Sequence, residues 1–137
     1  MSQESKVGFA AMNTAEFQVI ESIAANDDKP VIMLNLNSYA EAAEYPAGDL
    51  YVQYMAKLDL LLSEAGGSVL WRMPIDGSPL GGGVFDEIIA IYYPTHQAFL
   101  NMRSLPSSDE NYRLRDLAVA NAQLLRCTDL PKQWETS

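Results

Sequence analysis

Hydrophobic residues recur along the chain with two periods, and these periods predict helices and strands. Between Asp49 and Ala65 the apolar side chains return every three or four residues, which is the spacing of one face of an α-helix. Between Val84 and Tyr93 a run rich in β-branched and aromatic residues is typical of a strand. The same reading, with caps and turn residues, predicts further helices that begin at Asn13, Thr95 and Ser107, and further strands over Val31–Asn37, Ser68–Met73 and Asn121–Cys127.

The order of these elements defines a fold class. Behind an additional N-terminal helix at residues 13–25, the chain runs strand, helix, strand, strand, helix, strand, which is the split βαβ pattern. This order predicts an α+β, ferredoxin-like domain in which helices cover one face of a four-stranded antiparallel sheet. The other face would expose a large apolar patch, so we expect a homodimer that buries it. Residues 13–128 are expected to form this single domain, between a flexible N-terminus at 1–12 and a polar C-terminal tail at 129–137.

Composition and charge narrow the class of partner. With 48% hydrophobic and 20% charged residues the chain is globular, and its apolar runs are far shorter than the ~20 residues of a membrane span. The net charge of −9 divides into −7 over residues 1–71 (3 basic, 10 acidic) and −2 over residues 72–137 (6 basic, 8 acidic). Such a surface repels phosphate backbones, so nucleic acid and anionic membranes are not expected as partners. The first residues lack a signal-peptide pattern and Cys127 has no partner for an internal disulfide, so a reducing, cytoplasmic location is expected.

One histidine and one cysteine limit the chemistry of the chain. They cannot supply a Cys/His metal cluster, and no Ser-His-Asp set can be placed by motif, so neither a metal nor a cofactor is expected. Residues Gly81 to Gly83 lack the Lys-Ser/Thr pair and the following helix of a phosphate-binding loop. We interpret them as a flexible hairpin connection.

Alternation along the strands divides their residues between two faces. In the third strand the more apolar set, at every second position up to Tyr93, is expected to face the helices. In the second strand Val69, Trp71 and Met73 are expected to do the same. The polar residues of the strands would then line a cleft that binds a small molecule. These candidate ligand-binding residues are Asn35, Asn37, Arg72, Asp86 and Tyr92.

This candidate cleft has a functional and an ordinary interpretation. A carboxylate beside an arginine stays ionised and two amides can orient a carbonyl or hydroxyl, which would suit a carboxylate or enolate ligand. In the ordinary interpretation Arg72 and Asp86 only pair with each other, across strands or across a dimer. Asp86 and His96 are the candidates for moving a proton, although a histidine in the first turn of a helix is more often simply solvated.

Five short motifs occur in an order that is similar to a known family. They are Val31-Ile32-Met33-Leu34-Asn35-Leu36, Gly67-Ser68-Val69-Leu70-Trp71-Arg72, Phe85-Asp86-Glu87-Ile88, Tyr93-Pro94-Thr95 and Phe99-Leu100-Asn101-Met102. From about Phe17 to Cys127 the chain resembles the bacterial domain-of-unknown-function family numbered thirteen-thirty, within the dimeric α+β barrel superfamily. The resemblance implies a ferredoxin-like protomer whose sheet face meets a second copy to close a barrel.

The resemblance implies no particular reaction, since no catalytic residues of the family can be placed on this chain. The superfamily includes cofactor-independent monooxygenases, lactone isomerases and haem-binding enzymes. The haem-binding members need a well-placed ligand histidine, whereas His96 stands at a helix start. Members often carry a basic and an aromatic residue after the first strand motif, where this chain has Asn37-Ser38-Tyr39.

Three classes of function follow. The first is a domain that binds a small organic molecule in the cleft between sheet and helices, without chemistry. The second is a cofactor-independent monooxygenase or isomerase, in which Asp86 or His96 moves a proton while Asn35 and Arg72 hold an enolate-like oxygen. The third is a structural or interaction dimer without a ligand. Pocket volume separates the first two classes from the third.

Overall fold

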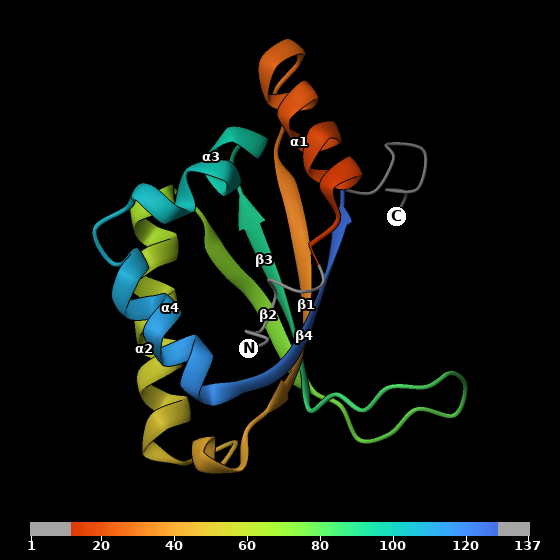
Figure 1. The fold of residues 1–137 in the computed structure, drawn as a ribbon, viewed down its shortest axis with the longest axis vertical. Helices are drawn as coiled ribbons and strands as arrows, with labels where there is room; N and C mark the ends of the chain where they lie inside the picture. The colour runs from red at the N-terminus through yellow and green to blue at the C-terminus, as the bar shows by residue number, and fades with distance from the viewer. Residues whose placement is uncertain (1–11, 129–137) are drawn as a thin grey trace, which may run out of the picture.

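The computed structural model describes residues 12–128 of the chain (Figure 1). The terminal segments expected at 1–12 and 129–137 lie, except for Met12, outside the described residues. The elements are α1 (Thr14–Asn26), β1 (Val31–Tyr39), η1 (Glu41–Ala43), α2 (Asp49–Ala65), β2 (Ser68–Pro74), β3 (Glu87–Tyr93), α3 (His96–Leu100), η2 (Asn101–Ser104), α4 (Ser108–Ala118) and β4 (Val119–Cys127).

The four strands form one antiparallel sheet in the order β2-β3-β1-β4 (Figure 1). Together with the chain order βαββαβ after α1, this arrangement is the ferredoxin-like fold. Helices α2 and α4 pack against each other, and α1 packs against α3. The predicted α+β class and four-stranded antiparallel sheet are therefore confirmed. Within residues 12–128 no helix is both long and apolar enough to cross a bilayer.

Local signals set the helix boundaries much as the sequence predicts. The Asn13 side chain accepts a hydrogen bond from the Glu16 N–H at 3.1 Å and starts α1. Thr95 caps α3 in the same way. Gly66 ends α2 with a φ of 82°, a left-handed conformation that favours glycine. The third strand differs from the prediction, because regular pairing begins at Glu87 rather than Val84.

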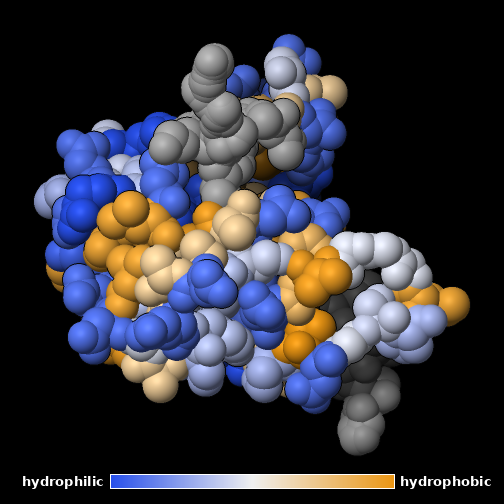
Figure 2. Space-filling view, turned by 60° about the horizontal axis from the view of Figure 1, so that its bottom comes forward, coloured by the Kyte–Doolittle hydropathy of each residue, from blue (hydrophilic) through white to orange (hydrophobic). Residues whose placement is uncertain are grey.

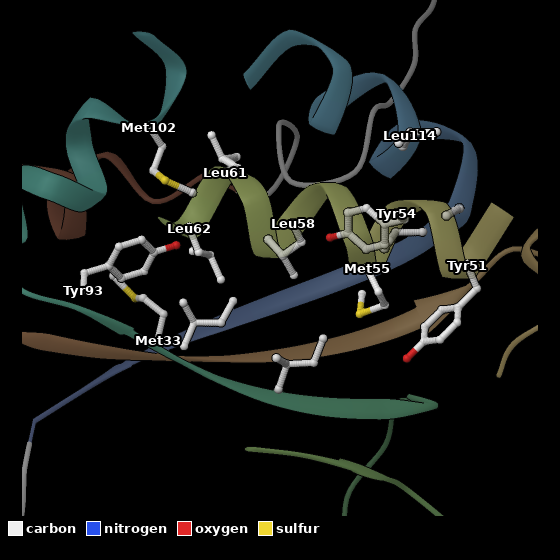
Figure 3. Close-up of a cluster of buried hydrophobic side chains, with 14 of the residues drawn as sticks. Met33, Tyr51, Tyr54, Met55, Leu58, Leu61, Leu62, Tyr93, Met102 and Leu114 are labelled. Carbon is white, nitrogen blue, oxygen red and sulfur yellow. The ribbon is translucent and has the colours of Figure 1, made fainter. Parts of the chain in front are cut away.

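The core lies between α2 and the sheet (Figure 3). One face of α2 is buried along its length, with Leu61 and Leu62 among the most completely buried side chains. Met33 from β1 and Tyr93 from β3 meet this face from the sheet. Each leucine buried in this way stabilises the fold by roughly 1.5–3 kcal/mol. The apolar face that the pattern of α2 predicts is therefore the side of the helix that packs on the sheet.

A bulge in β2 reverses its faces partway along the strand. The register runs from Val69 opposite Ile91 to Trp71 opposite Ala90, so Leu70 is an extra residue. Before the bulge Val69 faces the helices, as predicted. After it the prediction for Trp71 and Met73 is wrong, since they lie on the face that no helix covers and are 44% and 51% exposed.

The helices leave one sheet face open, which we call the uncovered sheet face. Register pairing and the bulge assign its apolar side chains to all four strands. They are Ile32, Leu34, Leu36, Trp71, Met73, Ile88, Ala90, Tyr92 and Leu125. An apolar sheet face that no helix covers is typical of an interaction site.

The connection between β2 and β3 extends beyond the sheet (Figure 1). Its residues 75–86 contain two strongly exposed apolar side chains, Leu80 at 89% and Val84 at 82%. Figure 2, viewed from the end that carries this loop, shows hydrophobic surface on the protruding segment. The hairpin connection predicted around Gly81 to Gly83 is thus present as a long, exposed loop.

Candidate functional site

A pocket of about 760 Å³ lies between the sheet and the helices. Met33 and Asn35 of β1 and Tyr93 of β3 form part of its floor, and β4 forms one side. Helices α1, α2, α3 and α4 each contribute wall residues. Pockets of roughly 300–1,000 Å³ with mostly apolar walls are typical of sites for small organic molecules.

Polar side chains gather on the α4 side of this pocket. Asn111 and Arg115 stand one helical turn apart on α4, and both line it. Tyr54 and Tyr93 line it as well, and their hydroxyls point toward each other with Leu58 between them (Figure 3). Burial raises the pKa of both phenols, and the Arg115 guanidinium opposes this rise in the pKa of each. Both tyrosines therefore remain neutral hydrogen-bond donors at ordinary pH.

Helix α1 closes another side of the pocket. Its Glu16 carboxylate pairs with the Arg126 guanidinium of β4, with one Nη2–Oε1 distance of 3.3 Å. The hydrogen bond from Arg126 holds the pKa of Glu16 below its ordinary value, so the pair stays charged at neutral pH. Phe17 of α1 stacks on Phe99 of α3, with ring centroids 6.1 Å apart. These contacts fix the additional helix against the domain.

A second polar group surrounds the carboxylate of Glu87 at the opposite end of β3 from Tyr93. Only 3% of Glu87 is exposed. The Tyr39 hydroxyl donates to its Oε1 at 2.6 Å, and the Tyr51 hydroxyl lies 3.0 Å from both carboxylate oxygens. Arg72 Nε lies 3.7 Å from Oε2, and Asn37 Nδ2 donates to the Tyr39 hydroxyl at 3.3 Å. We call these five residues the Glu87 cluster.

The Glu87 cluster is packed by aromatic rings. Tyr45 stacks on Tyr39 with centroids 4.8 Å apart and meets Tyr51 edge-on at 4.9 Å. Burial, with the hydrogen bond to Glu87, raises the pKa of both Tyr39 and Tyr51. Their hydroxyls therefore stay protonated and keep donating to the carboxylate. None of the five cluster residues lines the pocket, so the cluster joins β1, β2, β3 and α2 rather than facing a ligand there.

The structure separates the five predicted ligand-binding residues. Asn35 lines the pocket. Asn37 and Arg72 belong to the Glu87 cluster. Asp86 Oδ2 instead accepts the Tyr39 backbone N–H at 2.8 Å, and Tyr92 lies on the uncovered sheet face. These residues do not form one site.

The expected faces of β1 are the reason for this separation. Asn35 pairs with Ile89 and Asn37 with Glu87, so both asparagines share the face that the helices cover. The prediction that they face the same side as Tyr92 is wrong. The alternate face of β1, which contains Leu34, is apolar from Ile32 to Leu36 and yet turns away from the helices.

The ion pair of Arg72 in the structure also differs from the predicted pair with Asp86. The ion pair of Arg72 is with Glu87, the residue that follows Asp86. The cause is the bulge at Leu70, which turns Arg72 to the helix side of the sheet. The prediction of an Arg72–Asp86 pair is therefore wrong by one residue.

His96 is buried, with 1% of its surface exposed, so the expectation of a solvated histidine is wrong. Its backbone N–H donates to Asp28 Oδ1 at 2.7 Å, and its Nδ1 lies 2.8 Å from the Lys29 carbonyl oxygen. These contacts tie the start of α3 to the turn before β1. Neither His96 nor Asp86 lines the pocket.

The sequence analysis missed the central residues of two polar groups, the one on the α4 side of the pocket and the Glu87 cluster. For the pocket they are Asn111 and Arg115, and the usable signal is a polar residue at a core-facing position of α4, one turn before an arginine. For the cluster the missed centre is Glu87, and the usable signal is that four of the seven tyrosines lie between residues 39 and 54. Among residues 12–128, no three His, Cys, Asp or Glu side chains are grouped so that they could hold a metal ion.

Comparison with known proteins supports the fold. No family model matches the chain, and no curated protein does either. The chain is similar to the crystal structure of the RPA0582 protein of unknown function from Rhodopseudomonas palustris, with a TM-score of 0.70 and 24% identity over 88% of this chain and 95% of that one. A methylated form of RPA0582 gives a TM-score of 0.71 over 91% and 97% of the two chains, again at 24% identity. A protein from Thermobifida fusca, described as dimeric, ferredoxin-like and of unknown function, gives 0.47 at 12% identity over 74% and 92%.

Proposed function

We propose that this domain binds a small organic molecule in the pocket between the sheet and the helices. The observation that carries the proposal is the size and position of the pocket, about 760 Å³ with walls from every layer of the fold. Its surface combines aliphatic and aromatic side chains with a few convergent polar groups, which is the composition of a ligand site. Of the five predicted ligand-binding residues, Asn35 lies on the floor of this pocket, which supports a polar contact to the ligand there.

A cofactor-independent monooxygenase or isomerase is the alternative within the same pocket. It needs a group that moves a proton next to the ligand. Asp86 and His96 were the candidates, and neither lines the pocket. Ligand binding without catalysis therefore has more support.

Filling the pocket is the direct test of ligand binding. Ala122 lies on the helix side of β4 and lines the pocket, so Ala122→Trp places an indole inside it. Ligand-observed NMR with a mixture of small aromatic acids, amides and amines should detect binding to the unmodified protein and lose it in Ala122→Trp. The matched control is Val52→Trp, on the outer surface of α2 where Val52 is 52% exposed, and it should bind as the parent does. Equal binding by both variants, or no binding by the parent, would contradict the proposal.

We further propose that the protein is a homodimer formed through the uncovered sheet face, in the manner that the dimeric α+β barrel resemblance implies. The supporting observation is the apolar character of that face, where Trp71 and Met73 remain about half exposed. Membership of the family numbered thirteen-thirty and a cytoplasmic location are proposals that rest on the sequence motifs and on the single cysteine.

Sedimentation equilibrium at micromolar protein measures this association directly. We expect a mass of about twice the 15.1 kDa of the chain, because burying a large apolar face favours association. A single species at the chain mass would rule out the dimer and, with it, the barrel.

A further inference from the structure

We propose that the natural ligand of the pocket is an amphipathic organic acid, whose carboxylate lies against Asn111 and Arg115 of α4. This inference rests on the proposed function and names the class of ligand.

The first support is an unsatisfied donor. Asn111 is 3% exposed and lines the pocket, and within the described residues its Nδ2 has no hydrogen-bond partner. Buried polar groups are paired in the large majority of cases, so a buried amide nitrogen beside a pocket indicates an acceptor on the ligand. Arg115 lies one turn further along the same face of α4, where it can share that acceptor.

The second support is the charge of the pocket. Three arginines line it, Arg103, Arg115 and Arg126, whereas the chain as a whole carries a net charge of −9. Among the described lining residues the only carboxylate is Glu16, and it is paired with Arg126. Positive charge is thus concentrated in the pocket of an acidic protein, which favours anions and disfavours cations there.

The third support is the chemistry of the remaining walls. Tyr54 and Tyr93 present neutral hydroxyl donors, and a donor-rich wall complements a carboxylate, which only accepts hydrogen bonds. Met33, Phe99 and Leu100 line other parts of the pocket and offer apolar and aromatic surface. A ligand with one acidic end and an apolar body matches both parts.

Naphthylacetate and its neutral amide, naphthylacetamide, are suitable probes because they differ only at the group that the inference concerns. Isothermal titration calorimetry should show the acid binding at least tenfold more tightly than the amide. Arg115→Gln should remove this preference, and Arg115→Lys, which keeps the charge, should retain part of it. Arg113→Gln is the matched control, because Arg113 is on the same helix but is exposed and pairs with Glu110 outside the pocket. It should bind both probes as the parent does.

The outcomes separate this inference from the function on which it rests. Equal affinity of the parent for acid and amide would overturn the acid class while leaving a ligand pocket in place. An absence of binding by either probe, and by every member of the NMR mixture, would overturn both. Arg115 lies beside the buried Tyr54, so Arg115→Gln could disturb folding. Asn111→Leu then provides a second test, and an unchanged tenfold preference in that variant would contradict the role of Asn111.

Discussion

Glu87→Ala is expected to lower the free energy of unfolding by about 3–5 kcal/mol, and the melting temperature by roughly 10–20 °C. The substitution removes the acceptor of the Tyr39 and Tyr51 hydroxyls, which lie 2.6 and 3.0 Å from Glu87 Oε1. Each buried hydroxyl left without a partner costs about 1–3 kcal/mol. The loss of the Arg72 ion pair adds little, because that side chain is 44% exposed. Thermal unfolding followed by circular dichroism measures the effect.

Two variants show whether the buried network is the cause. Glu87→Gln keeps the volume and one acceptor oxygen, so it should lose less stability than Glu87→Ala. Glu21→Ala removes an exposed glutamate from α1 and should melt like the parent. If Glu87→Ala also melts like Glu21→Ala, the tyrosine hydroxyls are satisfied by water and the Glu87 cluster does not stabilise the fold.

Leu34→Glu is expected to weaken dimerisation by on the order of 100-fold or more. Leu34 lies on the uncovered sheet face of the central strand β1, with Ala90 and Leu125 opposite it in the neighbouring strands. In the free protomer a carboxylate there stays in water and the fold is retained. In the dimer the same carboxylate would be buried without a partner, which costs several kcal/mol. Sedimentation velocity over a concentration series gives the dissociation constant.

Val52→Glu is the matched control for this charge. It makes a similar substitution at an exposed apolar residue of α2, away from the sheet. Its dissociation constant should equal that of the parent. A Leu34→Glu protein that dimerises as tightly as Val52→Glu would show that the uncovered sheet face is not the interface.

The fold could be predicted from the sequence because most elements show a clear hydrophobic periodicity and are bounded by capping or turn residues. The alternation in β3 identifies Ile89 and Ile91 as core residues, and both are buried. The same logic fails for β1, where both faces are apolar over most of the strand. An apolar face such as that of Leu34 is expected to be buried, but hydrophobicity does not indicate whether helices or a second copy would bury it. The predicted assignment of the two faces of β1 is therefore the reverse of the one in the structure.

The candidate site could be predicted only in part, for two physical reasons. The bulge at Leu70 breaks the alternation of β2, and a one-residue shift exchanges every later side chain between the two faces. The second reason is that the fold brings together residues from distant parts of the chain. Asn111 and Arg115 line the pocket together with residues of β1 and β3, which are distant from them in sequence. Asn35 does line the pocket, but from the face of β1 opposite to the predicted one.

The bulge in β2 has a further consequence, for how the sheet can grow. In the order β2-β3-β1-β4, β2 is an edge strand, and its outer row of backbone groups could pair with a strand from another molecule. The extra residue Leu70 bends that row, and Pro74 ends it without an N–H to donate. Extension of the sheet past this edge is thereby disfavoured. At the β2 edge, therefore, strand pairing does not compete with the proposed association through the broad face of the sheet, which would give a closed pair of protomers rather than an open-ended fibre.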